Sequence, residues 1–460
     1  MTQGVTMRAS LDSRFEALLG ANGVRAEPTL LERYAIDGVT PRLVVLPSDA
    51  EQVSAILRVC FDEQWTVVPF GAGTQQHVGR ISEQPDVVLS TEKLNWVEAY
   101  DPGDLTISLH AGVPVKSALA ACAQHHQLLP IETAEPDTTI GGALASAQSG
   151  PLRAGFGSLR DFCIGISFVT GDGMTGRGGG RVVKNVAGYD LMKLLIGSYG
   201  SLGVITSANF KVFPAPQQAI TLICNSSSSA EAILLRDALL TSPLSPIACE
   251  IINPAALEYL HDVEPRDPDH WAPETSSKTD NTCWKLALRF AGSDCVLARI
   301  GRELSSSTSS TLSGVEEAEL WKQIGLFEQR LVRRHRNAMI FRVDVPLAES
   351  QSALEAAHKA ATDYNFLTPV IGRATVGSFV IGFLPLAIDP PAVTQYASAA
   401  SDFRSRLSKV ASAVVVRCPR DAKQHFDIWG STPTDLELMR KVKQALDPGG
   451  ILNRGRFLVG

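Results

Sequence analysis

The sequence predicts an α+β protein in which two α/β subdomains are followed by an α/β cap and a short C-terminal return. Three observations over the 460 residues lead to this prediction: a β-α-β pattern in residues 43–69, separate glycine clusters between residues 71 and 203, and a change of composition after Pro216. Hydrophobic residues make up 45% of the chain, which is enough apolar surface for more than one core. The expected domains are a helical segment at 1–40, a domain at 41–215 divided into subdomains 41–93 and 94–215, a cap at 216–424, and a return at 425–460.

The first subdomain is predicted from a strand, a helix and a second strand in close succession. The apolar run 43–46 is typical of a short buried strand. Ser48 and Glu51 fit a capping box, so we expect a helix to begin there. Residues 65–69 then form the next strand and lead directly into a glycine loop at 71–74.

The second subdomain is predicted from elements that surround further glycine clusters. Residues 105–110 alternate apolar and polar side chains, as in a half-buried strand. The other expected elements are a strand at 87–89 that completes the first subdomain, a helix to about residue 126, a segment of small residues at 133–160, a strand at 164–169, a loop at 176–180, and strands at 204–206 and 210–213.

The cap is predicted from alternating strand-like and helix-like segments after Pro216. Two polar tracts, 262–282 and 305–313, indicate exposed insertions. Strands are expected at 372–383 and 414–416. A final helix is expected to open near residue 432 and to stop at the Pro-Gly-Gly of 448–450, and it begins the return.

Composition excludes several classes of protein. The net charge of −6 gives no overall field for nucleic acid. The sequence contains no apolar run of ~18 residues, so it predicts no membrane span. No leader sequence is visible, and we expect a cytoplasmic protein. The eight cysteines are scattered, which predicts reduced thiols and neither a metal site nor an iron–sulfur cluster in this chain. The standard G-x-G-x-x-G, P-loop and G-x-S-x-G motifs are incomplete or absent.

The glycine clusters are the strongest functional signal. They lie at 71/73, 141/142, 155/157, 176–180 and 197/200/203. Backbone amides in such loops can approach a polyanion closely because no Cβ intervenes. Each cluster alone is better explained by a tight turn, but several loops together favour one long ligand with a pyrophosphate in its middle.

Five segments resemble the FAD-linked oxidase family, the PCMH-type or vanillyl-alcohol-oxidase-like flavoproteins. They are 69–74 (Pro-Phe-Gly-Ala-Gly-Thr), 139–143 (Thr-Ile-Gly-Gly-Ala), 157–161 (Gly-Ser-Leu-Arg-Asp), 200–206 (Gly-Ser-Leu-Gly-Val-Ile-Thr) and 447–456 (Asp-Pro-Gly-Gly-Ile-Leu-Asn-Arg-Gly-Arg). They occur in the family's order. The resemblance implies a PCMH-type FAD-binding domain of two α/β subdomains with an α/β cap, and FAD as the cofactor.

The resemblance also implies the residues that hold FAD. They are Pro69, Gly71, Ala72, Gly73, Thr74, Gln75, Thr139, Gly141, Gly142, Ser158, Asp161, Gly203, Val204, Ile205 and Asn453. For Asp161, capping a turn is an equal alternative. Some family members attach the flavin through a histidine. Because Thr74 occupies the aligned position and His77 is displaced by three residues, we expect non-covalent FAD.

A sixth segment, 183–191 (Val-Lys-Asn-Val-Ala-Gly-Tyr-Asp-Leu), resembles the glycolate oxidase branch, in particular its FAD-binding accessory subunit. Lys184 and Tyr189 are weak catalytic candidates; the alternative is that Lys184 pairs with Asp190 and the Tyr189 ring packs. The histidine-rich segment of the branch's catalytic subunit has no counterpart here, so no general base is identified.

The resemblance implies a chain that partners a catalytic flavin subunit and an iron–sulfur subunit, acts on a small 2-hydroxy acid, and reaches the inner face of the membrane only through those partners. One alternative is a self-sufficient FAD-dependent dehydrogenase for a D-lactate-like hydroxy acid. Another is a structural subunit whose FAD site has decayed.

Overall fold

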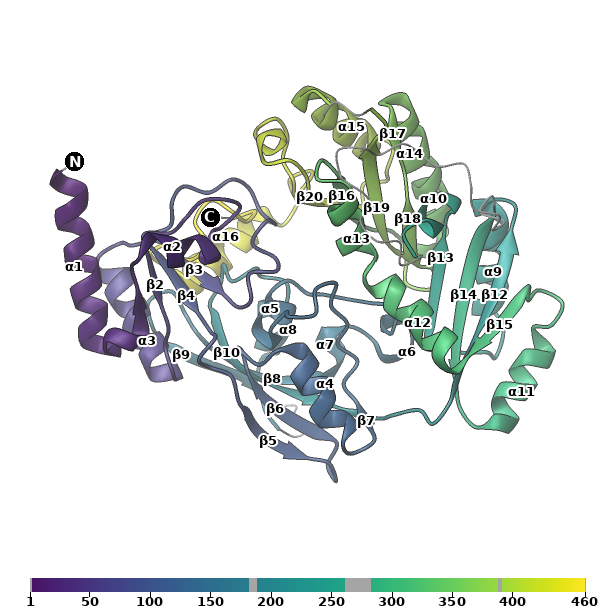
Figure 1. Ribbon diagram of the computed structural model, residues 1–460, viewed down its shortest axis with the longest axis horizontal. Helices are drawn as coiled ribbons and strands as arrows, with labels where there is room; N and C mark the ends of the chain where they lie inside the picture. Colours follow the sequence, from purple (N-terminus) through teal and green to yellow (C-terminus); the bar gives the residue numbers. More distant parts are fainter. Residues whose placement is uncertain (1, 182–187, 261–282, 388–390, 460) are drawn as a thin grey trace. The chain divides into compact units, whose positions relative to one another are not determined.

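The computed structural model describes residues 2–181, 188–260, 283–387 and 391–459 (Figure 1). The chain forms two compact units. Unit 1 contains Met1–Ser149, Ser158–Ala215 and Ser431–Gly460, and unit 2 contains Gly150–Gly157 and Pro216–Gly430. Unit 1 is therefore built from both ends of the sequence.

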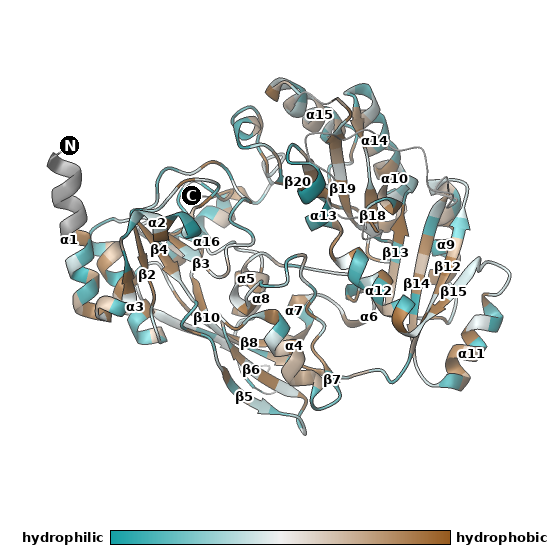
Figure 2. Cartoon of the chain, viewed as in Figure 1, coloured by the Kyte–Doolittle hydropathy of each residue, from teal (hydrophilic) through white to brown (hydrophobic). Residues whose placement is uncertain are grey.

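The first sheet of unit 1 has four strands in the order β1-β2-β4-β3. These strands are β1 (Val24–Arg25), β2 (Leu43–Val45), β3 (Val67–Phe70) and β4 (Val87–Ser90), and β2, β4 and β3 run parallel. Helix α3 (Ala50–Asp62) connects β2 to β3 and packs against α1 (Thr2–Leu19). The apolar faces of both helices and the sheet form one core, as the alternating hydropathy in Figure 2 shows.

The start of α3 differs by one residue from the predicted capping box. Asp49, not Ser48, is the N-cap, and its carboxylate accepts from the Gln52 amide at 2.7 Å. The Gln52 side chain accepts in return from the Ser48 amide at 2.8 Å. Aspartate caps a helix as well as serine does, so the sequence pattern fits two adjacent registers.

The second sheet of unit 1 is antiparallel, in the order β5-β6-β10-β8-β9. Its strands are β5 (Val97–Asp101), β6 (Thr106–His110), β8 (Cys163–Val169), β9 (Thr175–Gly179) and β10 (Val204–Lys211). Buried side chains of α4 (Val115–Ala123), α5 (Ile140–Ala145), α7 (Leu159–Phe162) and α8 (Leu191–Leu195) share a core with this sheet. The loop predicted at 176–180 is wrong, because β9 pairs with β8 there despite its glycines.

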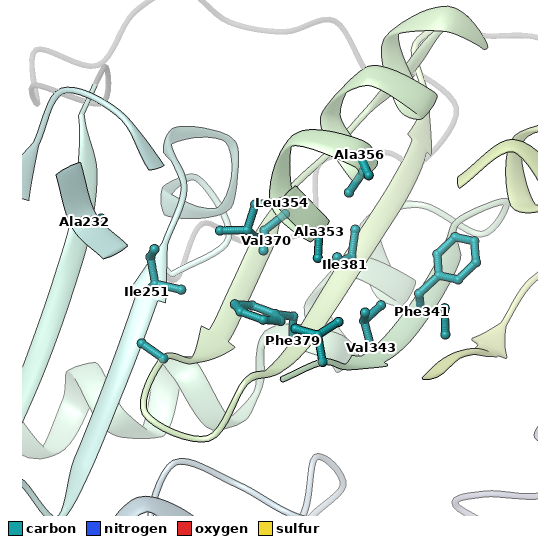
Figure 3. Close-up of a cluster of buried hydrophobic side chains, with 14 of the residues drawn as sticks. Ala232, Ile251, Phe341, Val343, Ala353, Leu354, Ala356, Val370, Phe379 and Ile381 are labelled. Carbon is teal, nitrogen blue, oxygen red and sulfur yellow. The ribbon is translucent and has the colours of Figure 1, made fainter. Parts of the chain in front are cut away.

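Unit 2 is one antiparallel sheet in the order β15-β12-β14-β13-β18-β19-β16-β20, with β17 paired to β19. The strands are β12 (Ala219–Ser226), β13 (Ala248–Ile252), β14 (Trp284–Ala291), β15 (Ser310–Ser313), β16 (Met339–Asp344), β17 (Phe366–Leu367), β18 (Val370–Arg373), β19 (Ser378–Pro385) and β20 (Ser412–Arg417). Its main core lies between this sheet and α9 (Ser229–Leu240), α11 (Asp294–Glu303), α14 (Ser350–Asp363) and α15 (Val393–Ser405). Figure 3 shows part of this core, with Phe379 and Ile381 from β19 and Ala353 from α14.

The two polar tracts of unit 2 have different outcomes. The tract 305–313 is not simply an exposed insertion, since its last four residues form the edge strand β15 paired with β12. The tract 262–282 lies outside the described residues. Throughout the described chain no helix is long and apolar enough to cross a membrane. The mixed helix and sheet content confirms the predicted α+β class.

Candidate FAD site

The glycine loop after β3 lies directly against the segment that begins α5. A Cβ added to Gly71 would stand 2.2 Å from the Thr139 hydroxyl oxygen, so only glycine fits. Gly73 has φ +79°, a left-handed conformation, and a Cβ there would meet the Phe70 ring at 2.6 Å. The hydroxyl oxygens of Thr74 and Thr138 lie 3.1 Å apart. Two segments almost seventy residues apart in sequence thus form one backbone-lined surface.

The second segment is fixed by its own cap and by the neighbouring β6. The Thr139 hydroxyl accepts from the Gly142 amide at 3.2 Å and begins α5. The Gly141 amide donates to the Ala111 carbonyl at 2.8 Å, and a Cβ on Gly141 would meet the Ala111 side chain at 2.9 Å. Close packing therefore explains Gly141, while Gly142 remains partly accessible.

The third segment of the site, residues 197–203, runs beside the end of α5. The amide of Gly197 donates to Leu144 at 3.0 Å, and the amide of Tyr199 donates to Ala145 at 2.8 Å. Gly200 has φ +68°, and a Cβ there would lie 3.1 Å from the Pro69 ring. The third segment thereby touches the start of the first.

The C-terminal return completes this arrangement. The Val67 amide donates to the Ile451 carbonyl at 2.9 Å, and the Asn453 amide donates to the Val67 carbonyl at 2.9 Å, so the return lies alongside β3. The Asn453 side-chain amide donates to the Tyr199 carbonyl. Asn453 adopts φ +47°, which asparagine tolerates better than most residues. Asn453 thus joins β3, which leads into the glycine loop, to the segment at residues 197–203.

A buried ion pair anchors helix α16 (Leu436–Leu446), which leads into the return. The Lys443 ammonium lies 2.5 Å from the Asp447 carboxylate and also donates to the carbonyls of Ser201 at 2.8 Å and Leu452 at 2.9 Å. Asp447 also accepts from the amides of Ile451 and Leu452. Burial lowers the pKa of Lys443, and the Asp447 charge opposes that shift. The pair therefore ties α16, the return and the third segment together.

Arg456 performs a similar role for the glycine loop. Its guanidinium donates to the Gln76 side chain at 2.9 Å and to the carbonyls of Gln76 and Val78 at 2.7 Å each. It also donates to the Asn453 side chain at 3.1 Å. The residue is 6% exposed, and burial lowers its pKa to about 10, so it stays protonated at neutral pH.

Three buried polar atoms on or next to these segments have no hydrogen-bond partner among the residues that the structure describes: Gln75 Oε1, Gln148 Nε2 and Ser198 Oγ. Buried polar atoms are nearly always paired, so orphans on adjacent segments indicate a ligand or ordered water. Together with the glycine surface, they fit a ligand that carries phosphates and polar ring edges, as FAD does.

The structure places other predicted residues differently. Ser158 and Asp161 form a capping box at α7, in which the carboxylate accepts from the Ser158 amide and hydroxyl at 2.7 Å each. The alternative in which Asp161 caps a turn is thus the one observed. Val204 and Ile205 lie buried at the start of β10, where their side chains pack in the two cores of unit 1 and their backbone pairs with β8.

The structure does not support a catalytic role for the weak candidate Tyr189, and it does not test Lys184. Tyr189 is 89% exposed, so the suggestion that its ring packs is wrong. Asp190 pairs with Lys193 at 2.6 Å. Lys184 lies outside the described residues.

Sequence reasoning missed Gln76, Gln148, Ser198 and Lys443. Ser198 stands within the 197/200/203 glycine cluster, which is the one signal that could have identified it. Lys443 lies on a helix otherwise predicted as amphipathic, where a lysine is normally solvated.

Comparison with known proteins matches the glycine loop, the start of α5 and the C-terminal return, whereas residues 197–203 lie outside both family matches. Residues 41–178 match the family model of the FAD binding domain, and residues 429–457 match that of the FAD linked oxidases, C-terminal domain. The chain is 25% identical to the probable mitochondrial D-lactate dehydrogenase of Danio rerio, over 97% of this chain and 91% of the relative. It is 44% identical to glycolate oxidase subunit GlcE of Escherichia coli, over 27% of this chain and 36% of the relative.

The fold has a counterpart among solved structures. The structure of p-cresol methylhydroxylase with substrate bound covers 98% of this chain and 96% of its own, with a TM-score of 0.74 and 17% identity. The first family match contains the glycine loop and α5, and the second contains the ion pair and the return. The chain therefore contains an FAD binding domain and the C-terminal domain of FAD linked oxidases, and it is an FAD-dependent oxidoreductase with FAD as its cofactor.

Proposed function

We propose that this chain is the FAD-binding subunit of a glycolate oxidase complex and takes part in the oxidation of glycolate to glyoxylate. The observation that carries the proposal is the 44% identity to subunit GlcE, well above the 25% identity that extends along the whole chain to a D-lactate dehydrogenase. When bound, FAD supplies a two-electron acceptor for oxidation of a CH–OH group.

In this proposal the chain's own residues bind and orient the cofactor. The amides of the 71–74 loop and the Thr74 hydroxyl face the pyrophosphate, with Gln75 as a further polar contact. Gly142 lies toward the flavin side, and the backbone at Val204 and Ile205 meets the adenine. Asn453 closes the site from the return. Binding is non-covalent because Thr74 offers no imidazole.

Two of the described histidines, His110 and His335, are poorly suited to the proton-transfer step. A general base must be accessible to substrate with a pKa near the working pH. His335 is buried, hydrogen-bonds the Tyr259 hydroxyl at 2.8 Å, and has its pKa lowered to about 4 by burial and by Arg334. His110 stacks on Trp96 with ring centroids 3.7 Å apart. We therefore assign substrate deprotonation to a catalytic flavin subunit, and onward electron transfer to an iron–sulfur subunit.

The second candidate is a self-sufficient dehydrogenase for a D-lactate-like hydroxy acid. One observation favours it: the alignment with the D-lactate dehydrogenase extends over 97% of this chain, whereas that with GlcE covers 27%. In that case unit 2 carries the substrate-specific residues.

Steady-state turnover with an artificial electron acceptor separates these candidates. We expect the purified FAD-loaded chain to reduce the acceptor negligibly with glycolate or D-lactate, and we expect glycolate turnover on addition of the two partner subunits. Robust turnover by the chain alone would contradict the subunit proposal and establish the second candidate. A reconstituted complex that oxidises glycolate equally well without this chain would also contradict the subunit proposal.

A further inference from the structure

Gln76 connects the two ends of the glycine loop. Its side-chain amide nitrogen donates to the Pro69 carbonyl at 3.1 Å, just before the loop begins. Its backbone amide lies 3.3 Å from the Gly73 carbonyl, within the loop itself. The side chain and backbone of Gln76 thus tie the end of the loop to its start and to its middle.

That orientation is imposed from the other end of the chain. Gln76 Oε1 accepts from the Arg456 guanidinium at 2.9 Å, which leaves its Nε2 as the group that faces Pro69. The second guanidinium nitrogen bridges the carbonyls of Gln76 and Val78 at 2.7 Å each. Residues 380 positions apart therefore share one buried hydrogen-bond network.

Arginine suits this network better than other side chains. The planar guanidinium presents several donors in a fixed arrangement, whereas a lysine ammonium is a point donor on a flexible stem. Four oxygens from three residues surround Arg456: the Gln76 side chain and carbonyl, the Val78 carbonyl and the Asn453 side chain. Asn453 in turn contacts the third segment at Tyr199.

We propose that Arg456 is a positioning residue of the FAD site: through Gln76 it holds the 71–74 loop in the conformation that receives the pyrophosphate, without touching the cofactor itself. The site is then organised by the last residues of the chain, and cofactor affinity depends on the return being docked.

The test is FAD titration of the apoprotein of the full chain, well below its melting temperature, in three variants. Arg456→Met is expected to raise the Kd for FAD by about tenfold or more, because several charge-assisted hydrogen bonds are lost. Arg456→Lys should fall between this variant and the wild type. Arg454→Met is the matched control, because the Arg454 side chain is exposed and donates to the nearby Gly450 carbonyl. The Kd of this variant for FAD should stay within about twofold of the wild-type value.

Two further readouts separate positioning from other roles. Guanidinium ions, far below denaturing concentration, should partly restore FAD binding to Arg456→Ala, whereas sodium chloride at equal ionic strength should not. The dependence of Kd on salt should be the same in Arg456→Lys and wild type. A flatter dependence in a charge-removing variant, Arg456→Met, than in wild type would show that Arg456 contacts the pyrophosphate and would overturn the proposal.

If Arg456→Met does not fold, Gln76→Met tests the same network from the loop side. Gln76→Met should raise the Kd for FAD. In the double variant with Arg456→Lys, the loss of binding free energy for FAD should be smaller than the sum of the losses in the two single variants. Additive effects, or a folded Arg456→Met protein with wild-type affinity, would refute the proposal.

Discussion

Replacing Gly71 by alanine is expected to weaken FAD binding on the order of 100-fold, equivalent to about 2.8 kcal/mol. The new Cβ would lie 2.2 Å from the Thr139 hydroxyl oxygen, so either the Thr139 side chain must leave its position at the start of α5 or the backbone of one segment must move. Each of these changes disturbs the contact between the two glycine segments that face the cofactor. Fluorescence titration of the apoprotein with FAD measures the change directly.

Two variants control this experiment. Gly325→Ala in helix α12 (Gly314–Gly325) has nothing within 4 Å of the added Cβ and should leave the Kd for FAD unchanged. The double variant Gly71→Ala with Thr139→Ala should recover part of the affinity for FAD, because the atom nearest to the new Cβ is removed. The recovery is incomplete because loss of the Thr139 helix cap costs about 1 kcal/mol. An unchanged Kd in the single variant would show that the loop does not face FAD.

Replacing Lys443 by methionine is expected to destabilise unit 1 by about 3–5 kcal/mol. The substitution leaves Asp447, whose side chain is 0% exposed, without its cation, and it removes donors from the carbonyls of Ser201 and Leu452. FAD release during urea titration reports this loss, since the site is built within unit 1.

The matched control is Lys441→Met on the same helix. Lys441 is exposed, so this change should alter the free energy of unfolding by no more than about 0.5 kcal/mol. Asp447→Asn should also lower the free energy of unfolding, because it leaves a buried ammonium with a neutral partner. A Lys443→Met protein within about 1 kcal/mol of wild type would show that the pair does not anchor the return.

Local patterns predicted much of the fold and of the site. The strands at β2 and β3 and the helix between them follow from apolar runs and a cap, and the first two glycine segments lie together as expected. The errors are also local. The serine- and threonine-rich β15 and the glycine-rich β9 lack the apolar periodicity of strands, and each is held in place by pairing with a neighbour.

The contacts that assemble the site were beyond sequence reasoning. Lys443 meets the Ser201 carbonyl across 242 positions, and Arg456 meets Gln76 across 380. Neither residue type nor spacing predicts such a pairing, because a lysine or arginine in a polar segment is normally solvated. Only the return of the chain to β3 creates the buried environment in which these charges have partners.

The most direct test of this account is the FAD content of the purified full chain, measured as flavin in the supernatant after acid precipitation. The account predicts one FAD per chain, all of it released into the supernatant, because the glycine segments and the return bind the cofactor without a covalent bond. A folded chain that yields no flavin, or a precipitate that keeps the yellow colour, would contradict it.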